Sequence, residues 1–200
     1  MLRVFSLLLL TLSFTAQSAT LLVLGDSLSA GYQMAQNQAW PTFLSDELKH
    51  KGVEVETVNG SVSGDTTGNG LARLPQLLDQ HQPDYVLIEL GANDGLRGFP
   101  PNLIKQNLTQ LINLSRDNGA EVILMQIQVP PNYGRRYTQS FEQLYPTLSE
   151  EKSVPLIPFF LAQIITDDSL MMQDGLHPKA DAQPWIAEFV AENIAPIIKD

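Results

Sequence analysis

Short apolar runs alternate with longer amphipathic segments along this chain. The apolar runs predict β-strands, because strands covered on both faces of a sheet read as nearly continuous hydrophobic sequence. The longer segments repeat apolar residues every three or four positions, which predicts helices with one buried face. The predicted strands are 21–24, 53–58, 85–90, 122–128 and 155–157. The predicted helices are 40–51, 71–79, 102–117, 137–152 and 184–198.

Two of the predicted helices carry end signals. Asn102 is a residue type that caps helix N-termini, and Gly119 follows the predicted end of the same helix. Pro184 stands in the first turn of the last helix, where its missing N–H is tolerated.

This alternation of strands and helices predicts an α/β fold. Right-handed crossovers between parallel strands place helices on both faces of a sheet. The expected architecture is therefore a three-layer α/β/α sandwich around a five-stranded parallel sheet. No internal repeat or linker divides the 200 residues, so we expect one domain over 19–200.

The N-terminus has the layout of a secretory signal peptide. Arg3 precedes an apolar stretch over 4–14, which is too short to span a membrane. Cleavage after Ser18 puts small residues, Ala16 and Ser18, at both required positions, whereas cleavage one residue later puts Gln17 at the first of them. We predict a signal peptide over 1–18, a periplasmic or secreted protein, and no integral membrane segment in the mature chain. The alternative is a buried first helix, although strand 21–24 needs nothing upstream.

Composition narrows the classes of partner. A formal net charge of -10 argues against binding nucleic acid or an anionic membrane through bulk electrostatics. Cysteine is absent, which excludes disulfides, a thiolate nucleophile and cysteine metal sites. We expect a monomer whose partner is a small molecule.

Unusual residues follow every predicted strand. Open parallel sheets bind ligands beyond the carboxyl ends of their strands, so these residues are expected to converge. They are Ser27 after the first strand, Gly64 after the second, Asn93 after the third, the segment 130–133 after the fourth, and the segment 174–177 beyond the fifth.

These residues suit acyl transfer. A serine nucleophile needs a general base and a group that orients the base. Among the three histidines, only His177 has a carboxylate, Asp174, on the same turn at the predicted sheet edge. The backbone amides of Ser27 and Gly64 and the side chain of Asn93 are candidate donors to an oxyanion.

Each block also has a structural interpretation. Gly64 can simply serve a turn, and Asn93 can form an Asx-turn. His177 can belong to an ordinary turn before a helix. Asp26 and Asp65 are expected to cap or brace their loops.

Apolar residues in the same loops predict a groove for an acyl chain, although they could equally pack their own loops. The segment 95–101 is predicted to be a mobile lip, with Gly95 and Gly98 absorbing dihedral change. The alternative is a rigid turn ahead of Asn102. The predicted groove residues are Leu28, Leu96, Phe99, Pro130, Pro131 and Tyr133.

Four blocks of this sequence, taken in order, resemble the signature blocks of the SGNH (GDSL-type) hydrolases. They are Gly-Asp-Ser-Leu-Ser-Ala-Gly-Tyr at 25–32, Ser-Val-Ser-Gly-Asp at 61–65, Gly-Ala-Asn-Asp at 91–94 and Asp-Gly-Leu-His-Pro at 174–178. The resemblance runs from about Thr20 to the C-terminus, and it includes 95–98, 133–137 and 181–185. It is strongest to the bacterial periplasmic thioesterase, lysophospholipase and arylesterase group. The Gly-x-Ser-x-Gly elbow of the α/β-hydrolases is absent.

The resemblance implies a flavodoxin-like sheet of order 2-1-3-4-5 and no metal or cofactor. It implies Ser27 as nucleophile and His177 as base, supported by Asp174. It also implies an oxyanion hole made by the amides of Ser27 and Gly64 and the side chain of Asn93.

The expected function is a secreted serine hydrolase for carboxylic esters and thioesters. One alternative is a carbohydrate O-acetyl esterase of the same superfamily. A second is a non-catalytic flavodoxin-like module that binds a phosphate at 25–29, which leaves Asn93, Asp174 and His177 unexplained.

Overall fold

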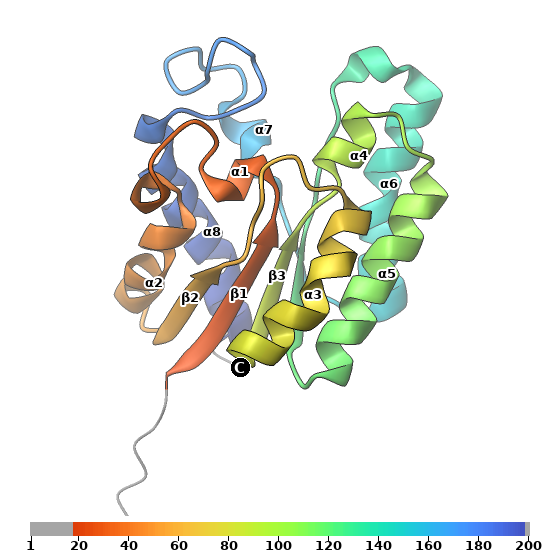
Figure 1. The fold of residues 1–200 in the computed structure, drawn as a ribbon. Helices are drawn as coiled ribbons and strands as arrows, with labels where there is room; N and C mark the ends of the chain where they lie inside the picture. Colours follow the sequence, from red (N-terminus) through yellow and green to blue (C-terminus); the bar gives the residue numbers. More distant parts are fainter. Residues whose placement is uncertain (1–17, 199–200) are drawn as a thin grey trace, which may run out of the picture.

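A five-stranded parallel sheet forms the centre of the molecule (Figure 1). The computed structural model describes residues 18–198, so 1–17 of the predicted signal peptide lie outside the described residues. The strand order is β2-β1-β3-β4-β5, which confirms the expected order. The strands are β1 (Ala19–Gly25), β2 (Val55–Asn59), β3 (Tyr85–Glu89), β4 (Glu121–Met125) and β5 (Leu156–Ile157).

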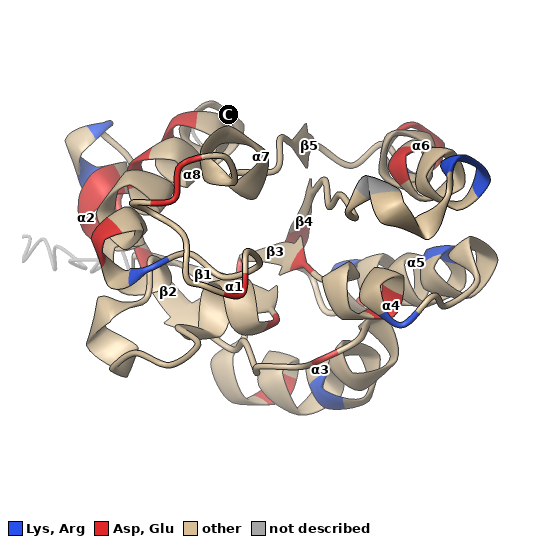
Figure 2. Cartoon of the chain, turned by 90° about the horizontal axis from the view of Figure 1, so that it is seen from above, with Lys and Arg blue, Asp and Glu red and all other residues tan. Residues whose placement is uncertain are grey.

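Helices cover both faces of the sheet and confirm the three-layer architecture (Figures 1 and 2). On one face α2 (Pro41–His50) packs against α8 (Gln183–Ile198). The other face carries α3 (Thr67–His81) and α5 (Pro101–Asp117), with α6 (Arg135–Lys152) beside α5. Leu21 to Leu24 of β1 are fully buried, as expected for a strand covered on both faces.

The register of the sheet brings the strand ends level. Val23 pairs with Asn59 of β2, and Gly25 pairs with Glu89 of β3. The segments that follow β1, β2 and β3 therefore leave the sheet at one edge, which is where the candidate residues lie.

Several boundaries differ from the sequence prediction. β4 ends at Met125 instead of 128, although the Gln126 amide still donates to the Ile157 oxygen of β5 at 2.9 Å. α3 starts at Thr67, four residues before the prediction, because Thr66 and Asn69 form a capping box. In it the Asn69 amide donates to Thr66 Oγ1, and the Thr66 amide donates to Asn69 Oδ1, each at 3.2 Å.

The predicted cap at Asn102 is wrong. Pro100 is the N-cap residue of α5 and Pro101 is its first helical residue, so Asn102 lies inside the first turn. Proline suits the first helical position because its φ is already helical and its missing N–H has no intrahelical partner. Pro184 lies in the first turn of α8, as expected.

Three short helices that the periodicity did not predict gather at the carboxyl end of the sheet (Figure 1). They are α1 (Ser27–Ala30), α4 (Ala92–Leu96) and α7 (Leu161–Ile164). Single 3₁₀ turns lie at Gln36–Gln38, Pro131–Tyr133 and Ala180–Ala182. Across 18–198, no helix is long and apolar enough to cross a membrane.

Candidate active site

Ser27, His177 and Asp174 form one hydrogen-bonded row. Ser27 Oγ lies 2.8 Å from His177 Nε2, and His177 Nδ1 lies 2.8 Å from Asp174 Oδ2. With the ring proton on Nδ1, that N–H donates to Asp174 and leaves Nε2 free to accept the Ser27 hydroxyl. Residues 150 positions apart in the chain therefore meet in the arrangement that activates a serine.

The turn that carries Ser27 is held by Asp26. Asp26 is the N-cap of α1, and its Oδ1 accepts from the Leu28 amide at 3.0 Å. Ser27 is the first residue of that helix, so its own amide has no intrahelical acceptor and points outward. The predicted capping role of Asp26 matches this geometry.

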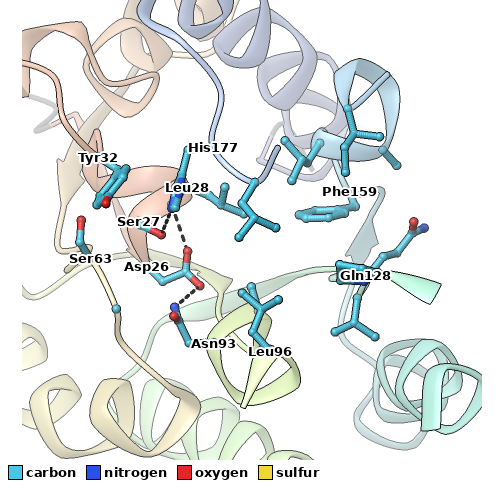
Figure 3. Close-up of a pocket in the computed structure, with 18 residues that line it drawn as sticks. Asp26, Ser27, Leu28, Tyr32, Ser63, Asn93, Leu96, Gln128, Phe159 and His177 are labelled. Atoms are coloured by element: carbon cyan, nitrogen blue, oxygen red, sulfur yellow. Dashed lines mark hydrogen bonds between the residues drawn. The ribbon is translucent and has the colours of Figure 1, made fainter. Parts of the chain in front are cut away.

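Asp174 shapes the loop that presents His177. Its Oδ1 accepts from the amides of Leu176 and His177 at 2.9 and 3.0 Å, while Oδ2 faces the ring. The His177 ring also stacks on Tyr32, with ring centroids 4.1 Å apart (Figure 3). The ring is therefore fixed on one side by a carboxylate and on its face by an aromatic ring.

Asn93 faces Asp26 across the site (Figure 3). Its Nδ2 donates to Asp26 Oδ2 and to the backbone oxygen of Asp65, both at 3.0 Å. Since an amide nitrogen carries two hydrogens, both are in use in this structure. An oxyanion at this position would have to share or replace one of these acceptors.

The Gly64 loop completes the set of candidate donors. Gly64 has φ 85°, a left-handed conformation that favours glycine, and a Cβ there would meet nothing within 4 Å. The loop is braced by Asp65, whose Oδ2 accepts from Arg73 Nε at 2.8 Å, and by Arg97, whose Nη2 donates to the Gly64 oxygen at 3.0 Å. Asp65 thus has the bracing role that was predicted.

Burial has the largest effect on the pKa of Asp26, the residue before the nucleophile. It raises the pKa of the Asp26 carboxyl from an ordinary 3.8 to about 7. Hydrogen bonds from the Leu28 amide and the Asn93 side chain lower this pKa, whereas the nearby charges of Asp65 and Asp94 raise it further. The carboxyl that bonds to both the Leu28 amide and Asn93 therefore titrates near neutral pH.

Asp174 behaves in the opposite way. Partial burial acts to raise its pKa, but the hydrogen bonds from the Leu176 amide and from the His177 ring and amide outweigh burial and hold the pKa below its ordinary value. Asp174 is therefore a carboxylate at neutral pH, as a partner of a catalytic histidine requires.

A cleft of about 520 Å³ opens beside Ser27 and runs past Leu96 toward Phe159 (Figure 3). Ser27, Asn93 and His177 stand at one end of it, and α7 forms part of the other end. Most of its wall is apolar, which suits a hydrocarbon chain. The apolar lining residues are Leu28, Ala92, Leu96, Val129, Pro130, Phe159, Leu161, Ala162, Ile165 and Leu176.

Two predicted groove residues do not line this cleft. Leu28, Leu96 and Pro130 do, but Phe99 packs against the core and Tyr133 lines a separate groove with Arg135 and Arg136. Tyr133 is drawn away because its hydroxyl donates to the Leu96 oxygen at 2.8 Å. The Pro131 side chain is outside the described part of the structure.

The segment 95–101 is more constrained than a lip with a hinge at Gly95. Gly95 is helical and buried, and a Cβ there would overlap Val129 and come within 3.0 Å of Phe141. Beyond it, the Phe99 oxygen accepts from the Tyr137 hydroxyl at 2.8 Å. These contacts match the alternative of a rigid turn.

Sequence reasoning missed residues that approach the site from unpredicted elements. Tyr32 follows α1, and Phe159, Leu161, Ala162 and Ile165 lie in and around α7. The one sequence signal for these cleft residues is the spacing of apolar positions over 156–165, and that spacing fits a segment of the hydrophobic core equally well.

The sequence profile of the GDSL-like lipase/acylhydrolase family matches residues 23–183, which is most of the chain. The chain belongs to this family. The match includes Ser27, Gly64, Asn93 and His177, and it confirms the resemblance inferred from the four sequence blocks.

Individual members of the family are similar over nearly the full length. The chain is 61% identical over 196 residues to an arylesterase from Vibrio mimicus, covering 97% of this chain and 98% of the relative. It is 50% identical over 193 residues to thioesterase 1/protease 1/lysophospholipase L1 of Escherichia coli (strain K12), covering 96% and 91%.

A solved family structure has the same fold. The psychrotrophic esterase from Pseudoalteromonas sp., inhibited by monoethylphosphonate, matches with a TM-score of 0.87 and 41% identity, covering 92% of this chain and 100% of that chain. Family membership and these relatives identify the present chain as an enzyme that hydrolyses ester bonds.

Proposed function

We propose that this enzyme cleaves carboxylic ester and thioester bonds through an acyl-enzyme formed on Ser27. The observation that carries the proposal is the row of two 2.8 Å hydrogen bonds from Ser27 through His177 to Asp174, placed at the mouth of an apolar cleft. Nucleophile, base and orienting carboxylate are thus in reach of one another and of a bound acyl group.

The proposed reaction has two halves. Ser27 Oγ attacks the acyl carbon while His177 Nε2 takes its proton, and His177 then gives that proton to the leaving alcohol or thiol. Water attacks the resulting Ser27 ester with His177 again as base, which releases the acid and restores the hydroxyl. Asp174 keeps the proton of the ring on Nδ1 and stabilises the imidazolium in both halves.

The oxyanion of each tetrahedral intermediate is assigned to three donors: the amides of Ser27 and Gly64 and the side chain of Asn93. Asn93 would redirect one N–H from Asp26 or from the Asp65 oxygen to the oxyanion. The two backbone amides, in contrast, are held in place by the chain and need little reorganisation when charge develops, which lowers the barrier.

The cleft supports an apolar acyl group as the substrate class. Relatives named arylesterase and thioesterase 1/protease 1/lysophospholipase L1 suggest aryl esters, acyl thioesters and lysophospholipids as the first compounds to test. A carbohydrate O-acetyl esterase needs no long apolar wall, so the wall formed by Phe159, Leu161 and Ile165 disfavours that alternative.

Export and monomeric state are further parts of the proposal. The predicted leader over 1–18 supports a periplasmic or secreted enzyme. The proposal of a monomer rests on the sequence, which predicts a small-molecule partner. Five large hydrophobic residues of the described chain are exposed, and one of them, Ile165, lines the cleft. They are Val62, Leu103, Leu114, Ile165 and Trp185.

A fluorophosphonate probe tests the mechanism. We expect it to label Ser27 in the wild type, and we expect Ser27→Ala to remain folded, to take up no probe and to lose turnover. Ser45→Ala, on α2, is a matched control that should label and turn over normally. Labelling of another serine in the wild type would overturn the assignment. Hydrolysis of aryl esters, acyl-CoA thioesters, lysophospholipids and acetylated sugars then defines the substrate class.

A further inference from the structure

The proposed mechanism does not use Glu89, a fully buried acid that contacts the turn formed by residues 26–29, which carries Ser27. Glu89 is the last residue of β3 and pairs with Gly25 of β1. Its Oε2 accepts from Ser29 Oγ at 2.7 Å and from the Asp26 amide at 3.3 Å. One carboxyl oxygen thus ties together the two residues that flank the Ser27–Leu28 dipeptide.

The position of this carboxyl explains why residue 25 is glycine. A Cβ on Gly25 would lie 2.6 Å from Glu89 Oε2 and 2.8 Å from Ser29 Oγ. Distances under 3.0 Å require a shift of one of the groups. Gly25 and Glu89 are therefore parts of one arrangement, in which the missing side chain of the first leaves space for the acid of the second.

The surroundings of Glu89 favour the neutral acid. Within the described chain, its Oε1 is buried without a hydrogen-bond partner, and it has no ion pair. Burying a charged carboxylate without an ion pair costs far more free energy than burying a neutral acid, even one whose hydroxyl has no partner. Burial raises the pKa of Glu89 well above its ordinary value, and the negative charge of Asp26 raises it further. The hydrogen bonds from the Ser29 hydroxyl and the Asp26 amide lower this pKa but do not outweigh burial.

We propose that Glu89, as a neutral acid, is a positioning residue that fixes the 26–29 turn and thereby the place of the Ser27 hydroxyl. This inference rests on Ser27 being the nucleophile. With the acid proton on Oε1, Oε2 is a carbonyl-type oxygen that can accept both hydrogen bonds. Without that acceptor, the Asp26 amide and the Ser29 hydroxyl lose their buried partner, and the turn is free to shift.

Two substitutions of similar volume separate the roles of shape, acceptor and charge. Glu89→Gln keeps an acceptor oxygen and stays uncharged, so we expect kcat close to the wild type. Glu89→Leu keeps the volume but has no acceptor, so we expect kcat to fall by about 10²-fold with KM little changed, as for a misplacement of about 1 Å in an active site. Both kcat values are counted per folded enzyme, from the fraction folded in circular dichroism.

A control and a milder variant complete the experiment. Val86→Ala lies on the same strand, with its side chain on the opposite face, so it should lower the melting temperature while kcat stays normal. Ser29→Ala removes one of the two donors without disturbing the strand, and it should lower kcat by less than Glu89→Leu. If Glu89→Leu fails to fold, Glu89→Gln and Ser29→Ala still decide the matter.

The outcomes are distinct. Normal kcat in Glu89→Leu or in Ser29→Ala would show that the hydrogen bonds to Glu89 Oε2 do not position the nucleophile. A large loss of kcat in Glu89→Gln would show that the carboxylate charge is needed and would overturn the neutral-acid assignment. Fluorophosphonate labelling of the wild type at a serine other than Ser27 would instead contradict the proposed function itself.

Discussion

At the scale of single residues, the side-chain amide of Asn93 donates both of its hydrogens to protein acceptors, Asp26 and the Asp65 oxygen. If one of them serves the oxyanion, its contribution appears only as charge develops. Asn93→Ala should therefore lower kcat by about 10²–10³-fold and leave KM nearly unchanged. Steady-state kinetics on a soluble aryl ester measures both constants.

A matched amide outside the site gives the control for this prediction. Asn193→Ala removes a side chain on α8 whose Nδ2 donates to the Phe189 oxygen at 2.8 Å, and kcat should not change. A rise in KM at constant kcat in Asn93→Ala would mean that Asn93 positions the substrate and does not stabilise the oxyanion.

Asp26 makes a prediction about stability. Its pKa is raised to about 7 in the folded protein, so between about pH 4 and pH 7 the folded state holds a proton that the unfolded state releases. The free energy of unfolding contributed by this group therefore falls as pH rises through that window, by roughly a few kcal/mol at most. Asp26→Asn keeps a good capping residue and removes the titration.

Urea denaturation of both proteins at pH 4, 5.5 and 7.5 tests this. We expect the difference in unfolding free energy, wild type minus Asp26→Asn, to decrease with pH. The lowered pKa of Asp174 acts in the opposite direction, since its contribution is lost as pH falls, but it is present in both proteins and cancels. A constant difference across the three pH values would show that folding does not raise the pKa of Asp26.

The sequence was sufficient to identify Ser27, His177 and Asp174 as candidates. Each follows a predicted strand, and together they supply the nucleophile, base and orienting carboxylate that acyl transfer requires. It was not sufficient for Glu89. In the sequence, Glu89 is simply a polar residue at the end of a predicted strand. Only the pairing of Glu89 with Gly25 shows that its carboxyl bonds to the turn that carries Ser27. Tyr32 was missed for a similar reason, since stacking on His177 is set by the tertiary fold.

At the scale of elements, long periodic segments were predictable and short ones were not. The main helices and strands follow from repeated apolar positions. In contrast, α1, α4 and α7 have four or five residues each, which is too short for a periodic signal. The end of β4 was misplaced because Ile127 is buried and continues the apolar pattern beyond Met125, where the strand ends.

The α4 region yields a prediction about local dynamics. The amides of Gly98 and Phe99 donate to the oxygens of Gly95 and Asp94 at 3.0 and 2.9 Å. Together with the Tyr137 hydroxyl on the Phe99 oxygen, these bonds should give slow hydrogen exchange in the free enzyme. Tyr137→Phe removes one hydroxyl and should speed exchange of these amides, with a loss of about 1 kcal/mol of stability.

Hydrogen-exchange mass spectrometry of the free enzyme and of its phosphonate adduct measures this. We expect similar protection of 95–101 in both states. Tyr85→Phe is a control, because the Tyr85 hydroxyl contacts the Ile198 oxygen at 3.5 Å, away from α4. Protection that is low in the free enzyme and rises only in the adduct would restore the mobile lip.

At the scale of the whole molecule, charged residues make up 17% of the sequence. Lys and Arg positions are scattered along the chain in Figure 2. The formal net charge of -10 is an excess of acidic residues over the whole sequence. The acidic surface supports solubility and leaves substrate choice to the cleft.

The proposed site of processing lies directly before the first strand of the sheet. β1 begins at Ala19, which pairs with Val55, and the Thr20 amide donates to Asp84 Oδ2 at 2.7 Å. Cleavage after Ser18 leaves this strand complete, whereas cleavage farther along the chain removes residues that pair in the sheet. We therefore keep cleavage after Ser18 as the proposed site of processing, since it leaves every residue of β1 in place.

We expect the enzyme recovered from the periplasm of an expressing bacterium to have Ala19 as its first residue, as read by intact mass. A chain made directly as 19–200 should have the same melting temperature and kcat, because it keeps all of β1 and the sheet. Ala16→Arg should block cleavage, since that position requires a small residue, while Gln17→Arg between the two required positions should be processed normally. Recovery of unprocessed chain in the cytoplasm of the wild type would contradict the export proposal and leave the active-site assignment untouched.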